Sequence, residues 1–220
     1  VMVICESCCR DYMSIYADQE GRETTPWQSE IKKDEEHFFI FKNAYSCGIQ
    51  TVPSLEKALT EYNQYNDKSF IDSASIVDMA HKAGYRVHWY SNQGHLGSAD
   101  TPVTLVAETS DVAKWTNQKL GKMQYDEALL DACEPLFIQQ TEDLSAYQLN
   151  FLHALANGIS TGFTQAAVLK EYRLGTAANV TRLKKSLTEK ALIPTDAPRQ
   201  LVISDPILKM WLKRRLWREP

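Results

Sequence analysis

The order of strand-like and helix-like segments changes near residue 133, and this change limits what the chain can fold into. Before that point, short apolar runs alternate with helical patterns. The apolar runs are residues 1–5, 38–41 and 85–91, and the helical patterns are residues 54–62 and 72–83. This alternation is typical of a parallel sheet with crossover helices. Residues 100–130 read as mostly helical, with an ambiguous stretch at 101–107.

After residue 133 the pattern becomes helical. Amphipathic segments cover residues 145–157, 164–172 and 176–190, and a last helix is expected over 206–217. Between them, residues 192–193 and 201–203 flank a proline-containing turn and predict a short hairpin. Three helices followed by a two-stranded wing is the order of a winged helix. We therefore expect an α/β fold, in which a partial parallel sheet with crossover helices precedes a small winged-helix domain.

Charge and length agree with two domains. The 220 residues carry a net charge of −4. Residues 1–133 hold 12 Lys and Arg against 20 Asp and Glu, a net charge of −8, whereas residues 134–220 hold 12 against 8, a net charge of +4. The composition excludes collagen, low-complexity disorder and a small disulfide scaffold. No apolar run reaches the ~18 residues that a membrane-spanning helix needs.

Two residues stand where phosphoryl chemistry would place them. Glu6 follows the first apolar run, and ligands of open α/β sheets bind beyond the carboxyl ends of strands. It is either a metal ligand or a solvated glutamate in a turn. Thr51 precedes a helix that carries Pro53 in its first turn. It is either a plain helix cap or a nucleophile whose phosphorylated form meets the positive end of the helix dipole.

The first part of the chain resembles the sulfatase-like phosphoethanolamine transferases of the alkaline phosphatase superfamily, over about residues 1–131. The motifs that carry the resemblance are VICES (3–7), RDYMSIY (10–16), TTP (24–26), FKNAYS (41–46), TVPSL (51–55), AHKAGY (80–85), WYSNQ (89–93) and YDE (125–127).

The resemblance implies a phosphoryl-transfer enzyme. It assigns Glu6 as a zinc ligand and Thr51 as both a zinc ligand and the nucleophile that takes the phosphoethanolamine group. The implied donor is a phospholipid such as phosphatidylethanolamine, and the implied acceptor is a lipid or a sugar. Zinc would lower the hydroxyl pKa and stabilise charge on the phosphoryl oxygens. Asn92 and His95, after the third apolar run, are candidate substrate contacts, and His95 is otherwise a histidine of a surface loop.

The chain departs from that family in two places. Cys5 replaces the glycine that precedes the family's glutamate, and no Asp-His dipeptide occurs in the chain, although the family completes its zinc site with one. The resemblance therefore implies an incomplete zinc site, and it leaves open whether the chain is an active enzyme.

The second part, about residues 134–217, resembles the C-terminal winged-helix region of bacterial AAA+-type ATPases. The motifs are EPLFIQQT (134–141), YQLNFL (147–152), YRLGTAANV (172–180), LKKSL (183–187) and SDPILKMWL (204–212). No Gly-x-x-x-x-Gly-Lys-Ser/Thr motif for ATP accompanies them. Arg182, Lys184 and Lys185 are candidate DNA contacts, and a solvated helix face explains them equally well.

The two resemblances predict a composite chain of bacterial origin, with domains at 1–131 and 134–220. One parent faces the periplasm from the inner membrane and the other is cytoplasmic, so they point to different compartments. Two functions remain open: a phosphoethanolamine-transferase fragment, or a non-enzymatic module that binds DNA or protein. A natural join, an engineered join and an artefact of gene assembly are all compatible with the sequence.

Overall fold

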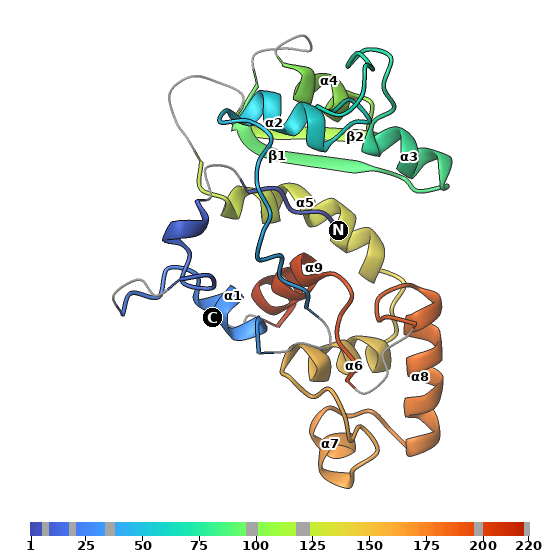
Figure 1. Ribbon diagram of the computed structural model, residues 1–220. Helices are drawn as coiled ribbons and strands as arrows, with labels where there is room; N and C mark the ends of the chain where they lie inside the picture. The colour runs from blue at the N-terminus through green and yellow to red at the C-terminus, as the bar shows by residue number, and fades with distance from the viewer. Residues whose placement is uncertain are drawn as a thin grey trace. The chain divides into compact units, whose positions relative to one another are not determined.

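A computed structural model describes residues 1–5, 9–17, 21–33, 38–95, 101–117, 124–195 and 200–217. Its contacts divide the chain into two compact units (Figure 1). Unit 1 comprises Val1–Trp89 and His95–Ala113, and unit 2 comprises Tyr90–Gly94 and Lys114–Pro220. The expected boundary near residues 131–134 falls inside a continuous helix, α5 (Glu127–Thr141).

The helices of unit 1 are short. They are the 3-10 helix η1 (Arg10–Tyr12), α1 (Pro26–Ile31), α2 (Thr51–Ala58), α3 (Ile76–Lys82) and α4 (Pro102–Glu108). Helix α3 begins where its sequence provides a capping box: Ser75 Oγ accepts from the Asp78 N–H, and Asp78 accepts from the Ser75 N–H. It ends before Gly84, whose φ of +84° suits a residue without a side chain. The helix expected over 72–83 is therefore confirmed, with a later start.

The sheet consists of β1 (His88–Gly94) and β2 (Val112–Asn117), with α4 as the connection between them. The Val112 N–H donates to the Val87 carbonyl (3.2 Å), and further along the side-chain amide of Asn117 donates to the backbone carbonyl of Asn92 (2.6 Å). Both pairs are 25 residues apart, and a constant offset means that the strands run parallel. The parallel sheet with a crossover helix is confirmed.

Several expected strands are wrong. Residues 1–5 and 38–41 belong to no strand of the described chain, and β2 lies in a stretch that the sequence predicted to be mostly helical. A strand needs a neighbour to satisfy its backbone groups, which an apolar run by itself does not provide. Neither run pairs with a strand among the residues that the structure describes, and most of their side chains are exposed, with Val1 84% and Phe39 80% exposed.

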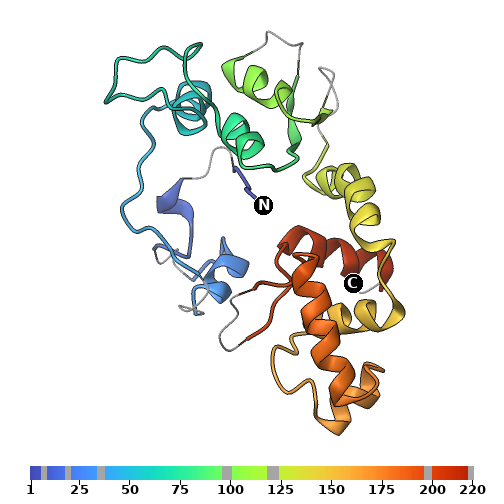
Figure 2. The ribbon, with the colours of Figure 1, turned by 90° about the vertical axis from the view of Figure 1, so that its right-hand side faces the viewer.

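Unit 2 contains the large core of the described chain. Its helices are α5, α6 (Ala146–Ala156), α7 (Ala166–Glu171), α8 (Ala177–Glu189), α9 (Pro206–Trp211) and the π-helix η2 (Leu212–Leu216). Figure 2 shows α8 in orange with the red α9 at its upper end. Phe151 stacks on Phe163 at 4.5 Å between ring centroids, and Leu152 and Leu187 are fully buried. The winged-helix order of helices is confirmed.

The wing departs from the expected hairpin. Residues 192–193 and 201–203 form no strand, although the Ser204 N–H donates to the Leu192 carbonyl (3.0 Å). The Leu201 N–H instead donates to the Ser160 carbonyl (3.0 Å), in the connection after α6. These backbone groups are thus satisfied by a loop rather than by a ladder.

The first prediction concerns Asp111, which joins the start of the sheet to α3. Asp111 Oδ2 accepts from the Val87 N–H (2.7 Å) and lies 2.9 Å from His81 Nε2. The Val87 N–H, and then His81, lower the pKa of Asp111. Because the folded pKa is depressed, the stabilisation is present above the unfolded pKa of about 3.9 and is lost as the pH falls through the lower folded value.

We therefore expect Asp111→Asn to lower the urea midpoint of unit 1 at neutral pH and to speed hydrogen exchange of the Val87 amide. The difference from the unsubstituted chain should shrink as the pH falls below about 4. Asp67→Asn, the same charge change at another exposed position of unit 1, is the control. An equal effect of both substitutions, or a difference that persists in acid, would contradict this role.

Candidate functional site

Thr51 is the first residue of α2. Gln50 is the residue that caps this helix, with extended φ and ψ of −118° and 149°, so Thr51 lies one position further into the helix than a cap. Its side chain is half-buried. The first turn of a helix is the positive end of its dipole and favours negative charge there. A phosphorylated hydroxyl at this position would therefore be stabilised.

Ser54 holds the loop before α2 against the helix. Its Oγ lies 2.7 Å from Ser46 Oγ, and it donates to the carbonyls of Gly48 (3.1 Å) and Gln50 (2.7 Å). The loop approaches closely, since a Cβ at Gly48 would come within 3.1 Å of Ser54 Oγ. These contacts hold the loop against the first turn of α2, where Thr51 lies.

The predicted metal site is only partly described. Glu6, the other predicted zinc ligand, lies outside the described residues, and so does the expected meeting of Glu6 with Thr51. Within the described ranges, no three His, Cys, Asp or Glu side chains come together in a way that could hold a metal ion. Burial, and then the negative charge of Asp205, raise the pKa of the Cys133 thiol to about 11, which disfavours its thiolate form at neutral pH. Zinc takes four ligands, so the donors that the structure describes do not fit a complete zinc site.

Asn92 joins the carboxyl ends of the two parallel strands to the start of α5. Its amide donates to the Gln124 carbonyl (2.9 Å) and to Asp126 Oδ1 (2.8 Å). Its own side-chain oxygen accepts from the Thr116 hydroxyl and from the Asn117 amide. Every polar atom of this side chain therefore has an intramolecular partner. We refer to these contacts as the strand-end network.

His95 directly follows β1. Its Nε2 lies 3.7 Å from Glu108 Oε1 at the end of α4, and the two side chains are 19% and 32% exposed. This contact becomes an ion pair only when the histidine is protonated. Whether Asn92 or His95 touches a substrate remains a prediction.

The three candidate DNA contacts on α8 have different surroundings. The Lys184 Nζ lies over the Phe163 ring, 5.2 Å from its centroid, and Lys185 Nζ lies 3.9 Å from Glu189 Oε1. Arg182 is exposed. Lys184 therefore covers the aromatic core of unit 2 with its side chain, as amphipathic lysines do.

The basic residues near the C-terminus pair with acidic residues of α5. Arg214 bonds to Glu127 (3.2 Å), and Arg215 bonds to Asp131. Trp217 stacks on His153 of α6 at 4.4 Å. These contacts attach the end of the chain to unit 2 and reduce the positive charge that it offers to a nucleic acid.

The model of the Sulfatase family matches residues 1–157, which is more than half of the chain. The chain belongs to the Sulfatase family. Residues 135–214 also match a model described as a probable winged helix domain. No solved structure matches this sulfatase-family chain.

Its curated relatives are bacterial phosphoethanolamine transferases. It is 29% identical to phosphoethanolamine transferase EptC of Escherichia coli K12 over 161 residues, 72% of this chain and 27% of the relative. It is 30% identical to CptA of Salmonella typhimurium LT2 over 59% of this chain and 22% of the relative. A putative phosphoethanolamine transferase of Haemophilus influenzae is 35% identical over 50% and 21%.

The chain spans about a quarter of the length of the relatives that it matches. None of the helices that the structure describes combines the length and the apolar character needed to cross a bilayer.

Sequence reasoning missed the strand-end network. The sequence does not predict Asn117 and Asp126 as partners of Asn92, because residues 100–130 are expected to be mostly helical, whereas residues 112–117 form β2. The available signal was the run 112–117 after a capped helix, whose β-branched and aromatic residues favour a strand.

The second prediction tests what Asn92 does. Asn92→Ala removes two donated and two accepted hydrogen bonds and leaves the buried Asn117 amide with its carbonyl partner alone. We expect the free energy of unfolding to fall by about 1–3 kcal/mol, measured by urea denaturation. Gln93→Ala, at the neighbouring exposed position, should change stability little. An unchanged stability of Asn92→Ala would remove the structural role and favour the substrate contact.

Proposed function

We propose that residues 1–131 are the nucleophile-bearing part of a phosphoethanolamine-transferase domain, with Thr51 as the residue that accepts the phosphoethanolamine group. The observation that carries this proposal is the place of Thr51 at the N-terminal turn of α2, within a chain of the Sulfatase family. The curated names of the relatives support the transferred group. A phospholipid such as phosphatidylethanolamine is the proposed donor, and a lipid or sugar hydroxyl is the proposed acceptor.

The reaction that we propose for the complete site is a displacement at phosphorus. The Thr51 Oγ1 forms the new P–O bond, the bond to the diacylglycerol oxygen breaks, and the hydroxyl proton ends on that leaving oxygen. The helix end stabilises the negative charge of the phosphorylated threonine. Ser54 and Ser46 hold the loop in position, which matters because phosphoryl transfer depends on positioning.

We further propose that this chain alone does not complete the zinc site of that domain. Glu6 and Thr51 are the two ligands that the resemblance supplies, and the Asp-His pair is absent from the sequence. An unassisted threonine hydroxyl is a weak nucleophile, because at neutral pH almost none of it is ionised. The proposed activity of the chain is accordingly vestigial.

The third prediction is therefore a negative one. Incubation of the chain with zinc and phosphatidylethanolamine should give no phosphoethanolamine adduct on Thr51 above the background of Thr51→Ala. The measurement is mass spectrometry of the tryptic peptide 43–57, with fragmentation to separate Thr51 from Ser46 and Ser54. Ser54→Ala is the control for modification of a neighbouring hydroxyl. A zinc-dependent adduct that Thr51→Ala alone abolishes would show that other residues complete the site.

The second candidate function belongs to residues 134–220, for which we propose nucleic-acid binding through α8. The observation in its favour is the exposure of Arg182 and Lys185, three residues apart on this helix. The charge of +4 over this part of the chain is favourable to a phosphate backbone. Its likeness to the winged helix of AAA+-type ATPases supports a role in protein interaction as the rival proposal.

The fourth prediction separates these two roles. If α8 contacts DNA, Arg182→Glu should weaken retention on duplex DNA for all sequences and reduce the slope of log affinity against log salt by about 1. Arg22→Glu makes the same charge change at an exposed position of unit 1 and should leave retention unchanged. Equal retention of both variants and the unsubstituted chain would eliminate α8 as the DNA surface.

A further inference from the structure

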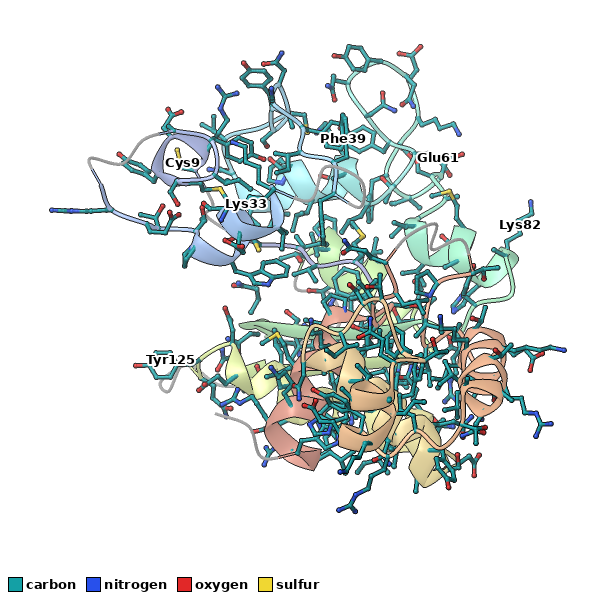
Figure 3. All side chains as sticks on the ribbon, turned by 90° about the horizontal axis from the view of Figure 1, so that it is seen from below. Cys9, Lys33, Phe39, Glu61, Lys82 and Tyr125 are labelled. Carbon is teal, nitrogen blue, oxygen red and sulfur yellow. The ribbon has the colours of Figure 1, made fainter. Side chains whose placement is uncertain are left out.

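Four helices of the described chain end in the same way. The residue after the C-cap has a positive φ, and the N–H of the next residue donates to the carbonyl five positions before it, at 3.0 Å in each case. This is the Schellman motif, in which glycine is preferred because a side chain is strained in the left-handed region. The residues at this position are Gly84 after α3 (whose last residue, Lys82, is labelled in Figure 3), Gly158 after α6, Arg173 after α7 and Ala191 after α8.

Arg173 is the charged residue among these four, and its φ is +50°. It is exposed, and its guanidinium has no hydrogen-bond or ion-pair partner within the described ranges. The arginines of η2 differ, because Arg214 and Arg215 pair with Glu127 and Asp131 of α5. No contact inside the described part of unit 2 therefore accounts for an arginine at this strained position. Strained residues are frequent at binding sites, where the side chain has a use outside the fold.

Arg173 also lies in the segment that carries the positive charge of unit 2. Residues 164–190, which span α7, the turn and α8, hold six Lys and Arg against two Asp and Glu, a net charge of +4. Since residues 134–220 hold 12 against 8, the rest of this part holds six against six and is neutral. A surface whose charge is mainly of one sign favours a polyanion. The six cations are Lys170, Arg173, Arg182, Lys184, Lys185 and Lys190.

We propose that Arg173 contacts the phosphate backbone of duplex DNA, so that the DNA surface extends from α8 across the turn to the end of α7. This inference rests on the proposed nucleic-acid binding of residues 134–220. When the second helix of a helix-turn-helix enters the major groove, the first crosses the backbone, which brings the turn near the phosphates. The planar guanidinium donates two parallel hydrogen bonds to phosphate oxygens. Such a contact positions the protein without reading the base sequence.

The fifth prediction is that Arg173→Gly changes stability and binding in opposite directions. Glycine relieves the left-handed backbone, so the urea midpoint of unit 2 should rise. Loss of one phosphate contact should reduce the slope of log affinity against log salt by about 1 and weaken binding about fivefold at about 0.15 M salt. The affinity is measured by fluorescence anisotropy of a labelled duplex DNA of mixed sequence, titrated with the full chain at several salt concentrations.

Two variants make the result specific to the guanidinium. Ala191→Gly makes the same backbone change at the end of α8 and should raise the urea midpoint without changing DNA affinity. Arg173→Lys keeps the charge and should keep the slope. If the unsubstituted chain binds DNA and Arg182→Glu weakens binding while Arg173→Gly does not, this inference is wrong and the proposed function stands. Equal weakening by Ala191→Gly would also overturn it. Absence of DNA binding by the unsubstituted chain would overturn both.

Discussion

A parallel strand is stable only when neighbouring backbone satisfies its hydrogen bonds and other elements cover its faces, and this constraint explains the pairing of β1 with β2. β1 and β2 meet the first requirement by pairing through the α4 connection. Asp111 accepts a hydrogen bond from the Val87 N–H just before β1. At the carboxyl ends of the two strands, the strand-end network satisfies the polar atoms of the Asn92 side chain. Residues 1–5 and 38–41 have equally strand-like sequences but lie outside this pair. Their side chains consequently remain exposed.

Unit 2 satisfies its own requirements internally. Its core contains Phe137, Phe151, Leu187 and Leu212, which are each at most 1% exposed. The π-helix η2 continues α9, and its arginines pair with Glu127 and Asp131 of α5. Exposed ion pairs of this kind contribute little to stability, so the apolar core is the main reason that these helices stay together.

The proposed chemistry needs both a local helix end at Thr51 and zinc ligands from other segments of the chain. Membership of the Sulfatase family supports the coarse class of phosphoryl transfer that we propose, and Thr51 occupies a position where a phosphorylated hydroxyl is favoured. A zinc site, however, needs donors from several segments held at fixed distances. Among the described residues no such group of donors comes together, so the proposal of an incomplete zinc site rests on the sequence.

The sequence by itself determined those features whose causes lie within a few residues. The cap at Ser145 was predicted and starts α6, and the apolar spacing of Val180, Leu183 and Leu187 predicted the buried face of α8. The helix expected over 72–83 also forms, but its start at Ser75 was not predicted. The sequence also indicated the family and the candidate nucleophile. Tertiary structure decided whether an apolar run became a strand, because pairing depends on a partner that is distant in sequence. Tertiary structure also determines that the polar atoms of the Asn92 side chain all have intramolecular hydrogen-bond partners and that Lys184 lies over the Phe163 ring. In both cases the partners are more than 20 positions away in the sequence.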